Sequence, residues 1–351
     1  MSVPKWYFKN GLRYIEPYFH KVTTKATSKW INKTIIEVMK SQFVDRKIDH
    51  YNNLIETGDM KITRKGEVIT GSILFNEKLQ KGDLVSNSVH IHEIPVADSP
   101  IKTIFEDENL LVVDKPGGIP VHPTIGYKYN TILEILKHER GYKQLHLCHR
   151  LDYVTSGILI IAKNMKTFHK IVKVIEFKEN LEKVYVARVT GEFPKNLECH
   201  EKIVNLDLKK PYGDGTPTPK KASTLFELIQ YNPDLNESIV RCMPQTGRKH
   251  QLRIHLRNLG YPIVNDPIYG IGKILSEPMK RNPSKTKFAQ LAQLAMDDIK
   301  VRQTDKKCDI CLKDGYVDPK LSDMSIYLHS CEYTYKGGWS YTTNLPEWTR
   351  I

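Results

Sequence analysis

The chain has 351 residues, of which 40% are hydrophobic and 26% are charged, and its formal net charge is +13. The length fits about two domains at roughly 150 residues each, and the composition indicates a globular protein with a packed core. No apolar run approaches the ~20 residues of a membrane span, so we expect no membrane part, and the basic charge favours a polyanionic partner such as RNA or DNA.

Residues 1–29 are rich in lysine and in aromatic side chains, and we predict that they form a basic N-terminal arm. Its cations can bind phosphates and its rings can stack on bases, although we expect most rings to pack on the protein itself. Pro4 and the charged, aromatic start differ from the apolar core of a secretory signal. We therefore predict a cytoplasmic protein with free cysteines, and the nucleus or mitochondria are the alternatives.

The pattern of residues 30–96 predicts a small separate module. Apolar residues at helical spacing predict a helix over 31–43, and a second short helix over 51–57 ends at Gly58. Glycine-punctuated segments then indicate a β-rich part. This order, with the motifs LIETGDMKI, GEVI and KGDLV, resembles the S4-like RNA-binding module named after ribosomal protein S4. The alternative is an unrelated α+β cap on the larger domain.

Residues 100–351 are predicted to form an α+β domain with a mixed or antiparallel sheet, because many strands alternate with few helices and mostly short links. Its predicted helices are 131–138, capped by Thr131 or Asn130, 168–176 and 250–259. Its predicted strands begin at Ile104 and continue over 157–162, 182–190, 223–230, 238–243 and 325–335. A basic insertion at about 273–320, with a helical patch over 289–296, is expected to be a disordered loop, and a substrate-contact element is the alternative.

The first candidate site is the segment His149–Gly157, HRLDYVTSG, a polar loop that leads into an apolar strand. Asp152 lies there among an arginine, a histidine, two hydroxyls and a glycine. A nearby cation can hold such a carboxylate ionised, which suits a nucleophile or a general base. Local chemistry alone favours a loop cap instead, in which the carboxylate accepts backbone N–H bonds.

Two further segments carry candidate chemistry. Pro244–His255, PQTGRKHQLRIH, is predicted to be a turn that opens a helix, and it is strongly basic. Cations near a helix N-terminus oppose the helix dipole, so they need a carboxylate or phosphate partner; a solvated basic helix is the alternative. Asp114–Pro123, DKPGGIPVHP, is a Gly/Pro loop after a strand.

These three strings, in this order and spacing, resemble the RluA family of RNA pseudouridine synthases over residues 100–270 and again over 325–348. The resemblance implies a pseudouridine synthase domain that isomerises uridine in RNA without a cofactor. It implies that Asp152 is catalytic, that Tyr185 in the KVYVARV strand lies against the target base, and that Arg253 pairs with Asp152. Whether Asp152 attacks the base, attacks the sugar or removes a proton from the sugar stays open. The substrate-binding residues that we expect beside them are Arg150, His149, Lys115, Arg248, His250 and Thr155.

The two ends of the chain, FKNGLRYIEPYF and GGWSYTTNLPEW, resemble the eukaryotic branch of this family that modifies tRNA anticodon loops, position 32 in particular. A loop uridine is also easier to flip than a stacked one. Position 31, rRNA and mRNA are the alternative targets. A non-catalytic RNA-binding protein and a hydrolase are disfavoured, because Asp152, Tyr185 and Arg253 occur together and no hydrolase triad is evident.

Cys308 and Cys311 form a CxxC motif without a second CxxC elsewhere in the chain. We predict a loop with two thiols, although His329 and Cys331 could complete a zinc site. We therefore predict a monomer that binds RNA, with tRNA as the first candidate, and that holds no metal and no small-molecule cofactor.

Overall fold

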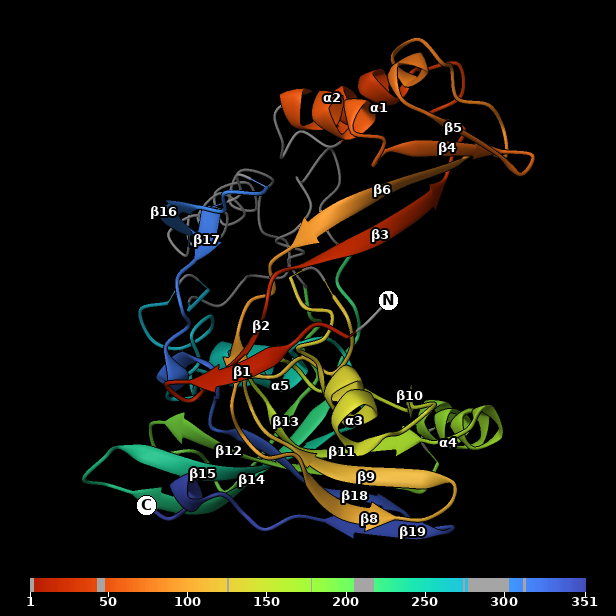
Figure 1. Cartoon of the computed structure of the whole chain (residues 1–351). Coiled ribbons are helices and arrows are strands. Elements are labelled where there is room, and N and C mark those ends of the chain that lie inside the picture. The colour runs from red at the N-terminus through yellow and green to blue at the C-terminus, as the bar shows by residue number, and fades with distance from the viewer. Residues whose placement is uncertain are drawn as a thin grey trace.

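The structure, a computed structural model, describes residues 3–42, 48–124, 126–177, 179–204, 218–273, 275–276, 303–311 and 314–351. Within them, ten strands form one large sheet (Figure 1). Eight follow the order β13-β14-β15-β12-β18-β11-β9-β8, while β10 pairs with β11 and β19 with β18. The bounds are β8 Lys102–Glu106, β9 Leu110–Lys115, β10 His146–Leu147, β11 Ser156–Ala162, β12 Leu181–Thr190, β13 Asn196–Cys199, β14 Thr224–Asn232, β15 Glu237–Pro244, β18 Leu328–Tyr335 and β19 Trp339–Thr342.

The sheet is mixed, as predicted, because β11 and β18 run parallel while the other pairs are antiparallel. Strand β11 is apolar throughout because core residues pack on both of its faces. Leu159 and Ile161 belong to the core cluster that contains helix α3 (Ile132–Arg140), whereas Ile158 and Ile160 belong to the cluster that contains Ile171 of helix α4 (Met165–Phe177). Successive strand side chains point to opposite faces, so a strand covered on both faces has no polar side.

The predicted helices of this domain are confirmed. Thr131 is the N-cap of α3, and its Oγ1 accepts the Glu134 N–H at 3.4 Å, the arrangement expected of an N-capping hydroxyl. Helix α5 (Gln251–Asn258) packs through Leu252 and Leu256 on residues of β12 and β15. Three short 3-10 helices also occur among the described residues: η1 Ser72–Phe75 in the small module, and η2 Leu321–Asp323 and η3 Glu347–Thr349 in the larger domain. In the part of the chain that the structure describes, no helix is long and apolar enough to span a membrane.

Gly157 makes the parallel junction between β11 and β18 possible. Its φ is +113°, and a Cβ there would lie 2.2 Å from the carbonyl oxygen of Ser330. Only glycine adopts this conformation and allows this approach without strain. The glycine that ends the HRLDYVTSG motif thus anchors the Asp152 loop to the centre of the sheet.

The predicted arm over residues 1–29 is corrected, because its described residues form paired strands. β1 (Trp6–Lys9) and β2 (Leu12–Ile15) make a hairpin that extends to β7 (Val96–Ala97), and β3 (Tyr18–Lys25) pairs with β6 (Leu84–Ile91) over eight residues. The hairpin turn has positive φ at Asn10 and Gly11, as tight hairpin turns require. The sheet of the small module therefore begins at Tyr18 rather than at residue 30.

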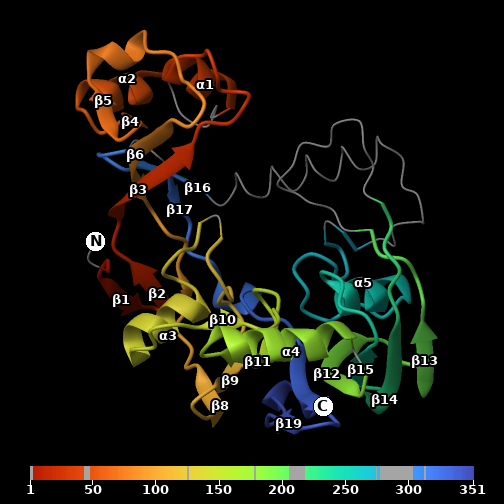
Figure 2. The same ribbon diagram turned by 90° about the vertical axis from the view of Figure 1, so that its right-hand side faces the viewer.

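The small module has the two predicted helices, α1 (Ile35–Gln42) and α2 (Ile48–Glu56), on a sheet of order β3-β6-β4-β5, with β4 at Lys61–Arg64 and β5 at Glu67–Thr70. A separate apolar cluster fills it, with Ile35, Ile55, Met60 and Ile62 completely buried. Figures 1 and 2 show the module on the same side of the large sheet as α5.

Part of the predicted insertion is ordered, which corrects the expectation of a disordered loop there. β16 (Gln303–Lys307) and β17 (Asp314–Tyr316) form a two-stranded sheet (Figure 1). The predicted helical patch over 289–296 lies outside the described residues.

Candidate active site

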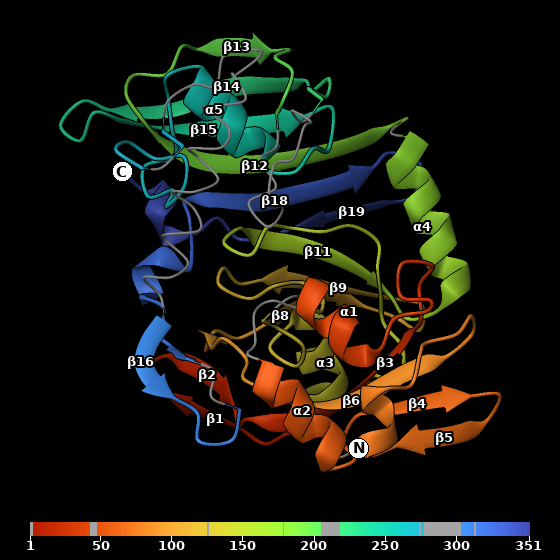
Figure 3. The ribbon, with the colours of Figure 1, turned by 90° about the horizontal axis from the view of Figure 1, so that it is seen from above.

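A cavity of about 560 Å³ lies where the Asp152 loop, the start of α5, helix α4 and strand β12 meet. Seen from above, α5 lies over β14 and β15, and α4 crosses one end of the sheet (Figure 3). The volume is typical of small-molecule pockets, about 300–1,000 Å³, and is large enough for a nucleoside. The charged side chains on its wall are Arg150, Asp152, Glu176, Lys183, Arg248, Lys249 and Arg253.

Asp152 lies on this wall in a loop fixed by its backbone. The Thr155 N–H donates to the Asp152 carbonyl at 3.2 Å, and the Gly118 N–H donates to the Tyr153 carbonyl at 2.9 Å. The carboxylate itself faces two side chains, with its Oδ2 3.5 Å from Arg253 Nη1 and 3.7 Å from His250 Nε2. Among the described residues, no backbone N–H is recorded as donating to it, so the loop-cap alternative does not describe this carboxylate.

Arg253 is held mainly by a residue that the sequence did not reveal. Its Nε and Nη2 donate to the two carboxylate oxygens of Asp266 at 2.6 and 2.8 Å. Both residues are buried, at 3% and 1% exposure. Burial alone would lower the pKa of Arg253, but hydrogen bonding and charge from Asp266 raise it above its ordinary value. Burial likewise would raise the pKa of Asp266, and the bonds from Arg253 lower it.

This pair explains how the basic start of α5 is tolerated. Cations near a helix N-terminus need an anionic partner, and Asp266 supplies one, with Asp152 as a more distant second. The predicted pairing of Arg253 with Asp152 is present in the structure, at 3.5 Å, as the weaker of the two contacts. The only sequence signal for Asp266 was an acidic residue in the turn NDPIYG. Many ordinary turns contain such a residue.

His250 lies between Asp152 and Tyr269, another residue that the sequence did not reveal. Its Nδ1 is 2.9 Å from the Tyr269 hydroxyl, and its backbone adopts a left-handed φ of 56° at the N-cap of α5. Burial lowers the pKa of His250 to about 4, so the imidazole is neutral at physiological pH. The Arg253 guanidinium lies over the Tyr269 ring, 5.0 Å from its centroid. This contact restricts the orientation of the Arg253 side chain.

Tyr185 lines the cavity from β12, as does Lys183 two residues before it. The pairing of β12 with β18 shifts register between Val184 and Tyr185, and such irregularities often re-aim side chains next to active sites. Burial raises the pKa of Tyr185 to about 12. Its hydroxyl therefore keeps its proton at physiological pH.

The remaining predicted residues separate into two groups. Arg150 and Arg248 are exposed on the rim of the cavity, and Lys249 joins them although it was not predicted. Thr155 lies on the wall, and its buried hydroxyl has no hydrogen-bond partner among the described residues. An unpaired buried hydroxyl is costly unless a ligand or water satisfies it, so this group is suited to bind a substrate.

His149 and Lys115 have structural partners instead. His149 Nε2 accepts the Ile160 N–H at 3.1 Å, and burial lowers its pKa to about 3, although the residue reaches the cavity wall. Lys115 does not line the cavity, which corrects its predicted substrate contact. It is fully buried, and its Nζ donates to the carbonyls of Pro116 and Tyr153 at 2.6 and 3.2 Å. A fully buried amino group that already donates to two carbonyls has no free surface for RNA.

The zinc arrangement considered for His329 and Cys331 is wrong. His329 lies between the hydroxyls of Ser156 and Thr343, at 2.9 and 2.6 Å, and the Cys331 thiol contacts the Val184 carbonyl at 3.4 Å. Among the described residues, the group suited to a metal ion consists instead of His90, His92, Cys308 and Cys311, none of which lines the cavity.

Residues 109–258 match the family model described as RNA pseudouridylate synthase. The chain is 37% identical to the "tRNA pseudouridine(32) synthase, mitochondrial" of Saccharomyces cerevisiae, over 96% of this chain and 77% of that protein. It is 33% identical to the "tRNA pseudouridine(31) synthase" of the same yeast, over 100% of this chain and 98% of that protein. It is also 34% identical to human "Pseudouridylate synthase RPUSD2", over 91% of this chain and 57% of that protein.

Proposed function

We propose that this chain, which belongs to the RNA pseudouridylate synthase family, isomerises a uridine of tRNA, with uridine 32 of the anticodon loop as its target. Members of the family are isomerases, so the substrate and product contain the same atoms. The bond between ribose C1′ and uracil N1 breaks, the uracil turns, and a bond forms between C1′ and C5. The hydrogen leaves C5 as a proton, and N1 gains one.

The observation that carries the proposal is the Asp152 carboxylate on the cavity wall, 3.5 Å from Arg253 Nη1. The guanidinium attracts the carboxylate at this distance and limits its rotation. A carboxylate held in this way can act on a uridine in the cavity, whether it attacks the base, attacks the sugar or removes a proton from the sugar. Tyr185, with its protonated hydroxyl, supplies the ring against which the uracil rests.

The target nucleotide has to leave its stack to reach Asp152. Base flipping costs a few kcal/mol in other base-modifying enzymes, and least for bases that are already unpaired. Arg150, Arg248 and Lys249 on the rim can hold the flanking phosphates while the base is inside. A uridine in a loop therefore fits this site better than one in a helix.

We also propose that the small module binds the same RNA, as the S4-like resemblance implies. Its position on the same side of the large sheet as α5 supports this role (Figures 1 and 2). A tRNA whose anticodon loop enters the cavity could then extend its stem toward the module. The alternative, an unrelated cap, predicts that the module makes no contribution to RNA affinity.

We prefer position 32 to position 31 because the chain is 37% identical to the yeast tRNA pseudouridine(32) synthase and 33% identical to the yeast tRNA pseudouridine(31) synthase. The test uses unmodified tRNA transcripts incubated with the purified chain, after which pseudouridine is mapped at nucleotide resolution. Conversion at position 32, and its loss in a transcript with cytidine at 32, is the expected result. Conversion at 31 alone, or only in rRNA or mRNA fragments, would contradict the assignment.

The location that we predict from the sequence is the cytoplasm, whereas one relative is named as a mitochondrial enzyme. We therefore propose mitochondria as well as the cytoplasm as its location. Fluorescence of the tagged chain in cells would distinguish the two.

A further inference from the structure

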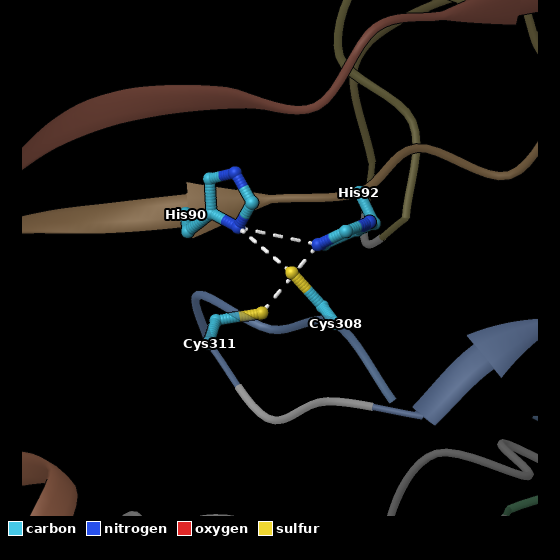
Figure 4. A group of neighbouring side chains, drawn as sticks. All are labelled: His90, His92, Cys308 and Cys311. Atoms are coloured by element: carbon cyan, nitrogen blue, oxygen red, sulfur yellow. Dashed lines mark hydrogen bonds between the residues drawn. The ribbon is translucent and has the colours of Figure 1, made fainter. Parts of the chain in front are cut away.

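Two histidines and two cysteines converge where the small module meets the β16–β17 hairpin (Figure 4). His90 belongs to β6 and His92 follows it, while Cys308 and Cys311 lie on the turn after β16. We propose that these four side chains bind one zinc ion, which fastens the hairpin to the module. The ion would be structural and separate from the cavity around Asp152.

The separations of the ligand atoms match a tetrahedral ion. His90 Nδ1 lies 3.6 Å from Cys308 Sγ, His92 Nε2 lies 3.4 Å from Cys311 Sγ, and the two imidazole nitrogens are 3.2 Å apart. All four atoms lie within 4.8 Å of one another. A tetrahedron with Zn–S bonds of about 2.3 Å and Zn–N bonds of about 2.0–2.1 Å has S–N edges of about 3.6 Å and N–N edges of about 3.4 Å.

The backbone presents the four groups without rearrangement. Residues 90 and 92 are two apart in extended chain, so their side chains lie on the same face. The Phe19 ring packs on the His90 ring at 4.8 Å between centroids and fixes its orientation. On the opposite side, the Ile310 N–H donates to Cys308 Sγ at 3.4 Å, and hydrogen bonds of this kind orient metal ligands.

The donor set favours zinc over the other metals that cysteine binds. Two thiolates and two imidazoles with no open position are typical of structural zinc, and a tetrahedral S₂N₂ set indicates zinc or an iron–sulfur centre. In a Rieske centre, cysteines and histidines bind different irons. Each cysteine here lies at single-ion distance from a histidine, which supports one shared ion. A dithiol that merely cycled with a disulfide would not need two imidazoles in contact with it.

The position of the site indicates what the ion does. Cys311 is seven residues before Asp318, whose Oδ2 accepts the Tyr14 hydroxyl at 2.7 Å, and Met324 is buried in the core of the larger domain. The histidines, in contrast, belong to the end of the module's β6. A metal that joins distant chain segments contributes its binding free energy to the folded state. Zinc here would therefore hold the module in one orientation relative to the larger domain.

The experiment measures zinc in the full chain, expressed with added zinc and purified under reducing conditions without chelator. We expect about one zinc per chain, and below roughly a tenth of that in the Cys308→Ser/Cys311→Ser variant. Cys199→Ala, which removes a buried thiol at the edge of the sheet, is the matched control and should keep about one. Hydrogen exchange should show at least about tenfold lower protection in β6 and the hairpin of the double variant, with the large sheet unchanged.

A second measurement does not depend on how the variant folds. Cobalt(II) exchanged into the wild-type chain should give the visible absorption of tetrahedral cobalt bound to thiolates. Zinc at less than about a tenth of the chain concentration in wild type, iron in its place, an octahedral cobalt spectrum, or full zinc content in a folded double variant would each overturn the proposal. None of these readouts uses RNA, so they are independent of the proposed tRNA activity.

Discussion

Arg253 binds both carboxylate oxygens of Asp266, and this leaves only its Nη1 directed at Asp152. Asp266 does not line the cavity, so we regard it as a positioning residue. It neutralises a buried guanidinium and sets the angle at which Arg253 approaches the proposed catalytic carboxylate. The geometry of the site thus depends on the buried ion pair between Arg253 and Asp266, although Asp266 does not line the cavity.

The first prediction concerns this pair. Asp266→Asn leaves Arg253 buried without its main counter-charge, and breaking a buried pair costs about 3–5 kcal/mol of unfolding free energy. Turnover at saturating tRNA should fall at least about tenfold, while tRNA affinity stays unchanged, because misplaced supporting groups reduce activity to this extent. Urea unfolding and single-turnover assays measure the two effects, with the exposed Asp234→Asn as control. Wild-type stability in Asp266→Asn would refute the role of the pair.

The second prediction concerns the hydroxyl of Tyr185. Because burial raises its pKa to about 12, the group can donate a hydrogen bond or a proton at physiological pH. Tyr185→Phe keeps the ring, so we expect unchanged tRNA affinity and a loss of turnover of about 10²–10⁴-fold if the hydroxyl transfers a proton. Tyr231→Phe, which removes a hydroxyl bonded to Asn236, should be neutral. Equal turnover in Tyr185→Phe and wild type would exclude the hydroxyl from the mechanism.

The third prediction concerns pH. Burial lowers the pKa of His149 to about 3 and those of His250 and His329 to about 4, from 6.5. Below pH 6.5 the unfolded chain binds these protons and the folded chain does not, so stability falls as the pH falls. Each histidine contributes about 1.4 kcal/mol per pH unit in this window, and the three together about 4.

Urea unfolding between pH 7.5 and 5 measures this slope. His329→Gln, which can keep hydrogen bonds to Ser156 and Thr343, should reduce the slope by about 1.4 kcal/mol per pH unit. His200→Gln, at a side chain that is 66% exposed, should leave it unchanged. A free energy of unfolding that is independent of pH in this range would mean that the three histidines titrate alike in both states.

The fourth prediction concerns the basic rim. Exposed Arg150 and Lys249 should bind phosphates next to the flipped nucleotide. Replacing both with Gln should weaken tRNA binding and reduce the slope of log affinity against log salt by about two. Lys195→Gln, an exposed lysine beside β13, is the control. An unchanged slope in the double variant would place the RNA on another surface.

The sequence predicted the large-sheet strands and helices well because their signals are local. The apolar run of β11 and the Thr131 cap of α3 each depend on neighbours in sequence. The strand pairing of β3 with β6 is different, since it joins residues that are 59 (Lys25 and Leu84) to 73 (Tyr18 and Ile91) positions apart. Five of the eight residues in Tyr18–Lys25 are tyrosine, phenylalanine, valine or threonine, which favour strands. The segment alone does not identify its partner strand, and its place in the lysine-rich start led to the prediction of an arm instead.

The candidate site was predictable only in part for the same reason. The family motif identified Asp152, Tyr185 and Arg253, which the structure brings to one cavity. Asp266 and Tyr269 lie in an ordinary-looking turn, and Lys115 looked like a surface cation beside a glycine loop although it is fully buried. Likewise, the histidines that face Cys308 and Cys311 are more than two hundred residues away from them, so the nearer His329 and Cys331 were considered instead.

Asp152 is proposed to catalyse pseudouridine formation in this cavity. Forming the C5–C1′ bond releases the hydrogen of C5, so tRNA labelled with tritium at uridine C5 reports each turnover directly. With enzyme in excess, the wild type should release tritium, whereas Asp152→Asn should bind the same tRNA with similar affinity and release none above background. Tritium release by Asp152→Asn at the wild-type rate would contradict the account.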